Sequence, residues 1–219
     1  RTKDSQFQNL DEHLLHTARL ASIFGSTYGW NRFEEIAGLL HDIGKATFSW
    51  QKYLLNSIKG KRETKIDHAT AGAQLLEYYI GSSSVLAKTA IQATIMFHHG
   101  SGLPDMISPD GSSEFFKRLN KRDVDSSLSD IKENLGETIL SKINELVTNN
   151  VFVANERSCF LDVCKKDSSS QKQLFFNMGM HLRNFSSCLI DADRTDSAAF
   201  DSSDKISLYS ENRHWSSLI

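Results

Sequence analysis

The 219-residue sequence predicts a single all-α domain, and three observations support that prediction. Only two prolines occur, Pro104 and Pro109, and both fall in one short stretch. Apolar residues recur at helical spacing, and Gly-, Ser- and Asp-rich stretches separate the periodic segments. The chain is long enough to bury one core, and no repeat divides it. We expect residues 1–200 to form this domain and residues 201–219 to form a polar C-terminal tail.

In the first half of the chain we predict helices over residues 10–30, 31–45, 46–56, 67–80 and 85–99. Asp11 is a candidate N-cap or first-turn acid of the first helix. Asn31 is a candidate N-cap of the second, with Glu34 at the capping-box position and Gly44 as its stop. Asp67 is a candidate N-cap of the fourth helix.

The second half is predicted to contain two amphipathic helices, over residues 112–122 and 128–147, and a final long helix over residues 171–200. A Gly-, Ser-, Asp- and Pro-rich loop covers residues 100–113. Residues 151–170 are ambiguous, because the apolar run at 151–154 could also form a brief strand.

Composition excludes several classes of protein. The formal net charge is −2, and a protein that held nucleic acid by charge alone would be more basic. The three cysteines show no CxxC spacing, so we expect no disulfide framework and a reducing cytoplasm. No apolar run is long enough to cross a bilayer, so no membrane partner is expected. The chain begins at Arg1, from which we expect either a removed leader or a longer parent chain.

Ionisable residues interrupt two of the apolar runs. Leu39 and Leu40 precede the pair His41–Asp42, and "IMF" precedes the pair His98–His99. A single histidine on a helix is most often an ordinary hydrogen-bonded residue, but burying several unpaired ionisable groups together is costly. A cation bound by imidazoles and a carboxylate would explain them, and this donor set suits Zn, Mn, Fe, Co or Ni. The absence of nearby cysteine argues against a structural zinc site.

Five segments together carry a family resemblance: "HLLHTARLA", "GLLHDIGKATFSWQKYL", "DHATAGA", "FHHG" and "LRNFSSCLIDADRTDS". They resemble the HD superfamily of metal-dependent phosphohydrolases. Taken in this order they look like the HD nuclease domain of the type I CRISPR-associated nuclease-helicase. The resemblance spans about residues 13–197 and implies an all-α HD domain with a dinuclear metal site in a central cleft.

The resemblance also implies roles for individual residues. Asp42 would bridge two ions and, with Lys45 facing the phosphate, would form the catalytic centre. One ion would be held by His13, His41, Asp42 and Asp193, and the other by Asp42, His68, His98 and His99. His16, one turn from His13, is an alternative candidate for the ligand on the first helix. Asp191 is likewise an alternative candidate to Asp193. The spacing to Ser197 favours Asp193.

The implied activity is metal-dependent endo- or exonucleolytic hydrolysis of single-stranded DNA in CRISPR antiviral defence, in a prokaryotic cytoplasm. The implied cofactors are two divalent ions, for which imidazole ligands favour Mn, Ni, Fe or Co, with Mg possible. The implied partners are a helicase and a CRISPR surveillance complex. Two alternatives are an HD phosphohydrolase acting on nucleotides or cyclic nucleotides, and a non-catalytic helical module with a structural metal.

Further features bear on the substrate. The loop at residues 59–65 carries cations that could form a rim for nucleic acid, namely Lys61, Arg62 and Lys65, and residues 117–122 form a second basic stretch. Phe48 and Trp50 could stack on bases, although core packing is the expected role. No GxxxxGK[ST] phosphate loop is present, so a helicase would be separate or fused downstream. The polar tail could begin the linker to it.

Overall fold

The computed structural model describes residues 7–80, 85–100, 102–121, 127–148, 162–166 and 168–201. Its helices are α1 (Leu10–Gly25), η1 (Ser26–Tyr28), α2 (Asn31–Leu40), η2 (Ile43–Ala46), α3 (Phe48–Ile58), α4 (Ala69–Ile80), α5 (Val85–Phe97), α6 (Glu114–Leu119), α7 (Leu128–Asn134), α8 (Glu137–Thr148), α10 (Val163–Lys166) and α11 (Gln171–Asp201). No strand occurs in these ranges, so the all-α prediction is confirmed. The possible strand at 151–154 lies outside them.

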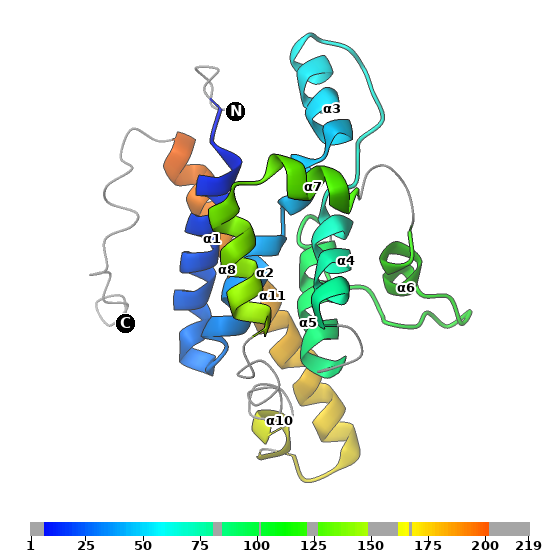
Figure 1. Ribbon diagram of the computed structural model, residues 1–219. Helices are drawn as coiled ribbons and strands as arrows, with labels where there is room; N and C mark the ends of the chain where they lie inside the picture. Colours follow the sequence, from blue (N-terminus) through cyan, green and yellow to red (C-terminus); the bar gives the residue numbers. More distant parts are fainter. Residues whose placement is uncertain are drawn as a thin grey trace.

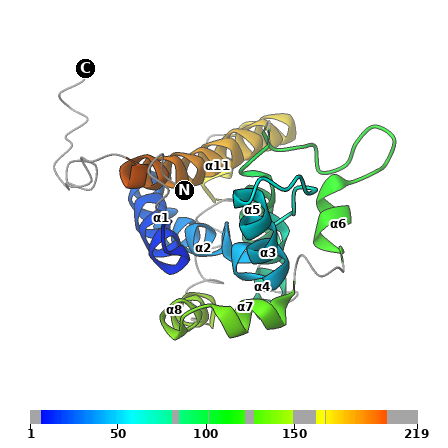
Figure 2. The ribbon, with the colours of Figure 1, turned by 90° about the horizontal axis from the view of Figure 1, so that it is seen from above.

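The helices pack around α2, which lies between α1 and α5 (Figures 1 and 2). Seen from above, α11 lies along one side of this layer, and α7 and α8 lie on the opposite side (Figure 2). One apolar cluster joins most of the helices, including α1, α2, α4, α5, α8 and α11, because each of these turns a stripe of apolar residues inward. Its fully buried members include Leu14, Leu39, Leu40, Leu75, Ile91, Ile95, Phe185 and Leu189.

The second helix is shorter than the sequence predicted. It ends at Leu40, and the three-residue-per-turn helix η2 begins at Ile43, so Gly44 does not stop α2. Gly44 serves another purpose, because a Cβ atom there would lie 2.1 Å from the carbonyl oxygen of His68. The glycine therefore allows η2 to touch the backbone at the start of α4.

The predicted caps had mixed outcomes. Asn9 caps α1, and Asp11 is an acid of its first turn. The capping box at Asn31 and Glu34 is wrong, because Asn31 is already helical and Glu34 turns into the core, where it is fully buried. Asp67 does act as a cap, accepting a 3.2 Å hydrogen bond from the Thr70 N–H.

Residues 128–147, predicted as one helix, form two. α7 ends before Leu135, whose backbone is extended and whose side chain is buried. The N–H of Gly136 then donates a 3.2 Å hydrogen bond to Asp11 of α1. A Cβ atom at position 136 would lie 2.3 Å from that carboxylate, so the glycine allows the bend.

The last helix is as predicted and forms the longest element, α11. Residues 202–219 lie outside the described ranges, so the division into a domain and a tail stays a prediction. Across the part of the chain that the structure covers, no helix has both the length and the apolarity to cross a membrane.

Candidate metal centre

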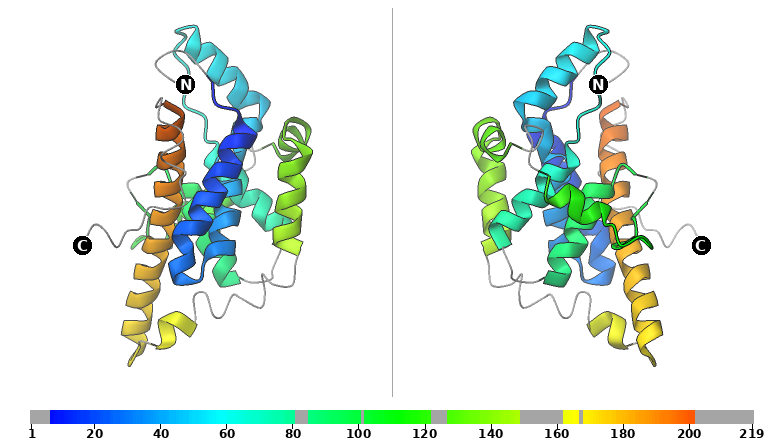
Figure 3. Two further views of the ribbon diagram at one scale, coloured as in Figure 1. Left: turned by 90° about the vertical axis from the view of Figure 1, so that its left-hand side faces the viewer. Right: turned by 90° about the vertical axis from the view of Figure 1, so that its right-hand side faces the viewer.

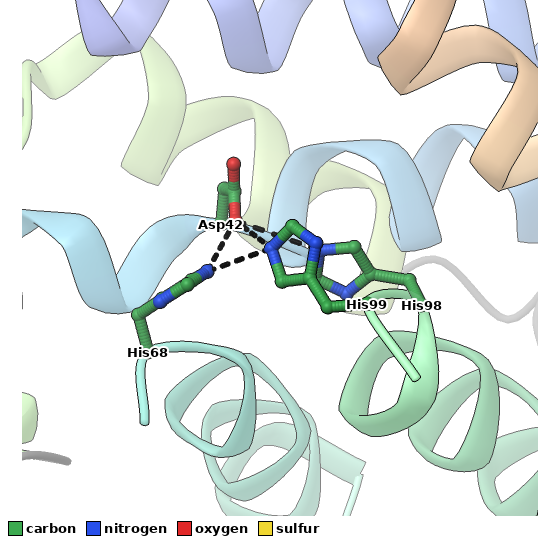
Figure 4. Close-up of side chains that lie close together, drawn as sticks. All are labelled: Asp42, His68, His98 and His99. Carbon is green, nitrogen blue, oxygen red and sulfur yellow. Dashed lines mark hydrogen bonds and ion pairs between the residues drawn. The ribbon is translucent and has the colours of Figure 1, made fainter. Parts of the chain in front are cut away.

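Two groups of four side chains gather where α1, η2, α4, α5 and α11 approach one another. In each group the candidate ligand atoms lie within 4.8 Å of one another. The first group comes from α1, the end of α2, and α11: His13, His41, Asp42 and Asp193. The second comes from the residues flanking η2, α4 and α5: Asp42, His68, His98 and His99 (Figure 4). These memberships match the sets that the sequence predicted, and the role of each residue as a ligand stays a prediction.

Asp42 belongs to both groups and divides its two carboxylate oxygens between them. Its Oδ2 atom lies 3.4 Å from Nε2 of His13 and 3.4 Å from Nε2 of His41. Its Oδ1 atom faces the other way, 3.1 Å from Nε2 of His68 (Figure 4). The same Oδ1 lies 3.6 Å from His98 and 3.7 Å from His99. One carboxylate can therefore touch two neighbouring cations.

Backbone carbonyls fix the orientation of two histidines. Nδ1 of His41 lies 2.8 Å from the carbonyl oxygen of Gly38, and Nδ1 of His98 lies 2.6 Å from that of Ile95. A carbonyl can only accept, so each Nδ1 carries a proton and donates it. Each Nε2 is then the atom that can offer a lone pair. Both Nε2 atoms are buried and have no hydrogen-bond partner among the residues described.

The spacing of these atoms fits a transition-metal ion. When metal–ligand bonds are near 2.1 Å, neighbouring ligand atoms around the ion lie about 3 to 3.5 Å apart. Nε2 of His68 lies 2.9 Å from Nε2 of His99, and Nε2 of His13 lies 3.4 Å from Oδ1 of Asp193. His41 lies 3.7 Å from the same Asp193 oxygen. The orphaned imidazole nitrogens and these separations together fit a divalent cation in either group.

The buried ionisable groups of the site shift one another's pKa values. Asp42 is fully buried, which alone would raise its pKa, but His41, Lys45 and His13 hold the pKa well below its usual range. Burial would lower the pKa of His13, but three nearby carboxylates outweigh it and raise the pKa to about 11. The pKa values of Asp42 and Asp193 are both lowered, so these two carboxylates are ionised at neutral pH, and a cation that takes His13 as a ligand must displace a proton.

Asp196 is a site residue that the sequence reading missed. It is fully buried on α11, one turn after Asp193, and its Oδ2 atom lies 2.6 Å from Nδ1 of His13. It therefore orients the His13 ring from the side opposite Asp42. The third aspartate in "DADRTDS", on the same helical face as Asp193, was the available signal.

The two competing candidates are separated by geometry. The His16 side chain is 51% exposed, and its Nδ1 atom lies 3.2 Å from Asp196, so His16 belongs to neither group. Asp191 is also exposed, and its carboxylate accepts a long hydrogen bond, 3.5 Å, from the Ser187 hydroxyl. Asp193 is the aspartate of this pair that faces the histidines.

Two glycines bring the ligand-bearing segments together. Gly44 lets η2 meet the His68 backbone, as described above. A Cβ atom at Gly72 on α4 would lie 2.0 Å from the carbonyl oxygen of Leu40, the last residue of α2. The Gly of "HATAG" therefore allows α4, with His68 just before it, to pack against the end of α2 beside His41 and Asp42.

Lys45 and Trp50 lie beside the two groups, Lys45 at the Asp42 oxygen of the first and Trp50 against His68 of the second. The Lys45 ammonium donates to Oδ2 of Asp42, and its side chain is 25% exposed. The same ammonium lies 5.8 Å from the centre of the Trp50 ring. Trp50 meets His68 edge to face, with ring centres 6.1 Å apart. We expected Phe48 and Trp50 to pack in the core. That prediction is wrong for Phe48, whose side chain is 54% exposed.

The basic stretches differ from each other in the structure. The side chains of Lys61, Arg62 and Lys65 are all exposed in the loop before α4. Arg118 in the second stretch is instead a structural cross-link, because it donates to Asp67 at 2.8 Å, to Thr70 at 3.1 Å and to the Met96 carbonyl. The guanidinium of Arg118 is therefore already engaged within the fold and does not add to a cationic surface for nucleic acid.

Comparison with known proteins adds one finding. The model of the HD domain family matches residues 10–145, more than half of the chain. The matched span contains every member of the two groups except Asp193, which lies beyond it on α11. A search of curated proteins found no significant match.

Proposed function

Since the chain belongs to the HD domain family, whose members are typically metal-dependent hydrolases, we propose that it is a metal-dependent nuclease that cuts single-stranded DNA in type I CRISPR interference. Family membership supports a metal-dependent hydrolase. The nucleic-acid substrate, the helicase and surveillance-complex partners and the prokaryotic cytoplasm are our proposal, drawn from the resemblance of the ordered motifs. The proposal includes two divalent ions, held by the two groups that share Asp42.

The observation that carries the proposal is the division of the Asp42 oxygens between two groups of imidazoles. Sites that hydrolyse phosphodiesters commonly hold two ions about 3.5–4 Å apart, which is a separation that one bridging carboxylate can span. Ions bound there would lower the pKa of a coordinated water and neutralise charge developing at phosphorus. The chain's own contribution is to hold the ligand atoms in place with buried carbonyl and carboxylate contacts.

Lys45 has a second proposed role. Its ammonium pairs with the Asp42 oxygen that also faces His13 and His41. A cation at that oxygen would repel the ammonium and favour its pairing with an anionic ligand. A phosphodiester beside the site would provide that partner, and Lys45 would then stabilise charge on its oxygens.

The test is to offer circular single-stranded DNA, mononucleotides and a cyclic dinucleotide side by side, with Mn²⁺, Ni²⁺ or Mg²⁺. We expect the circular DNA to be cut in the presence of a transition metal and not in a chelator. Asp42→Ala should abolish this cleavage while circular dichroism still shows a helical protein. Asp105→Ala, an exposed aspartate outside both groups, is the matched control and should cut at the parental rate.

Two results would contradict the proposal. Turnover of nucleotides alone would assign the chain to the nucleotide phosphohydrolases of the same superfamily. Undiminished DNA cleavage by the Asp42→Ala variant would show that the catalytic site lies elsewhere.

A further inference from the structure

Helix α3 is unusual because it contributes no buried residue to the core. Six of its eleven residues are apolar or aromatic, yet all of them are at least partly exposed. Phe48, Leu55 and Ile58, which share one helical face, are 54%, 56% and 36% exposed. The helix projects beyond the rest of the domain (Figures 1 and 3). A surface of this kind calls for a ligand or a partner.

The base of α3 is nevertheless fixed firmly beside the metal groups. The Phe48 N–H donates a 3.1 Å hydrogen bond to Asp130 of α7. The Gln51 amide donates a 2.7 Å hydrogen bond to the carbonyl of Lys45. The Thr47 hydroxyl caps the helix by accepting from the Trp50 N–H at 3.3 Å. These contacts hold the first turn of α3 in a defined place relative to η2.

Trp50 connects this helix to the candidate metal centre. Its ring lies edge to face with the imidazole of His68 and within 5.8 Å of the Lys45 ammonium. It is only partly buried, so part of the indole reaches solvent. A substrate whose phosphate lies at the His68 group would therefore bring its adjoining base within reach of this indole.

The loop that follows α3 has the charge that such a substrate requires. Four exposed cations occur between residues 59 and 65: Lys59, Lys61, Arg62 and Lys65. Glu63 is the acidic residue in that stretch, and it accepts a 2.7 Å hydrogen bond from Asn56 of α3. The local excess of positive charge contrasts with the net charge of −2 of the whole chain. An aromatic surface beside a cationic track is the combination that binds single-stranded nucleic acid.

We propose that α3 and residues 59–65 form a single-strand-binding arm. In this arm Trp50 stacks on the base next to the cleaved phosphodiester, and Lys61, Arg62 and Lys65 contact the flanking phosphates. The inference rests on the proposed nuclease function and adds the surface that selects an unpaired strand. It predicts that stacking and charge contribute separately to the affinity for a single strand. The stacking contribution requires a base, and the charge contribution does not.

The test measures binding of a fluorescent oligothymidine strand by anisotropy. A chelator prevents cleavage during the measurement, and no arm residue belongs to the metal groups. Trp50→Ala should weaken binding roughly tenfold, and Trp50→Phe should restore most of the loss, because a ring can still stack. On an abasic strand of equal length, Trp50→Ala and the parent should bind equally. Replacing Lys61, Arg62 and Lys65 by alanine should lower the slope of log affinity against log salt by about 2, since each phosphate contact contributes about 0.7.

Phe176→Ala is the matched control, because Phe176 is an exposed aromatic (67%) on α11, and it should bind like the parent. With Mn²⁺ present, Trp50→Ala should also raise the KM for the strand. Equal binding of thymidine strands by parent and Trp50→Ala would overturn the arm while leaving the nuclease intact. If Trp50→Ala lost as much affinity for the abasic strand as for the normal strand, the stacking role of Trp50 would be overturned. A parent that neither binds nor cuts single strands would overturn the proposed function itself, which separates the two failures.

Discussion

Nδ1 of His13 lies 2.6 Å from Oδ2 of Asp196, a fully buried carboxylate that belongs to neither candidate metal group. The opposite nitrogen of the ring, Nε2, points at Asp42 and Asp193, 3.4 Å from each. A histidine held from behind by a carboxylate in this way is a common support for a metal ligand. Asp196 is therefore a positioning residue for His13.

This relationship predicts the effect of Asp196→Asn. The amide keeps the size of the side chain but presents a weaker and neutral partner to His13. We expect Mn²⁺ affinity to fall about 10- to 100-fold, which is typical when such an outer contact is lost. Isothermal titration calorimetry measures this directly. Asp191→Asn on the exposed side of α11 should bind Mn²⁺ like the parent, and an unchanged affinity in Asp196→Asn would contradict the positioning role.

The second prediction concerns Gly44. A Cβ atom there would meet the His68 carbonyl oxygen at 2.1 Å, so Gly44→Ala must push η2 away from the start of α4. We expect the free energy of unfolding to fall by about 1–3 kcal/mol, as for other overpacked sites. Metal affinity should fall as well, because the shift separates Asp42 from His68. Urea titration of the metal-free protein measures the first effect.

The control for Gly44→Ala is Gly179→Ala on α11. A Cβ atom there meets the flexible end of the Arg183 side chain, so the substitution should be neutral or stabilise by up to about 1 kcal/mol. If both variants unfolded at the parental urea concentration, the close approach of η2 to His68 would have no energetic weight.

Gly44 and Asp196 also show which features of the structure the sequence could predict and which it could not. Helical periodicity was enough for the all-α class and for α11, because long amphipathic segments report their own conformation. The boundaries at Leu40 and Leu135 could not be read from the sequence. They depend on contacts with distant residues, namely the His68 backbone at Gly44 and the Asp11 carboxylate at Gly136. Motif order predicted the seven ligand candidates of the two groups, whereas Asp196 lies within the last motif, "LRNFSSCLIDADRTDS", at a position to which no role was assigned.

The third prediction concerns Glu34, a fully buried acid whose two oxygens have no hydrogen-bond partner in the described part of the chain. Burial raises the pKa of its carboxyl well above the usual 4.5, and the nearby Cys188 thiol opposes this only in part. Above pH 4.5 the unfolded chain loses this proton while the folded chain keeps it. Glu34 therefore lowers stability as pH rises, by at most about 1.4 kcal/mol per pH unit.

Glu34→Gln should remove that loss. We expect the variant to gain stability over the parent as the pH rises above 5, with little difference near pH 4. Urea titrations of both metal-free proteins at each pH measure this. Parallel stability curves over the whole range would mean that Glu34 is not a protonated acid in the fold.

The fourth prediction separates the two aspartates of "DAD". Asp193 faces His13 and His41, whereas Asp191 is exposed on the same helix. Asp193→Ala should reduce the metal content from about two ions per chain to about one, since the second group does not include it. Elemental analysis after dialysis measures the content. Asp191→Ala should keep both ions, and the reverse result would exchange the two assignments.

The central claim is that Asp42 bridges two ions, and the most direct measurement is anomalous X-ray scattering from crystals grown with Mn²⁺. We predict two anomalous peaks about 3.5–4 Å apart, one on each side of the Asp42 carboxylate. The first should lie among His13, His41 and Asp193, and the second among His68, His98 and His99. A single peak, or peaks that do not contact Asp42, would contradict the bridged two-ion site.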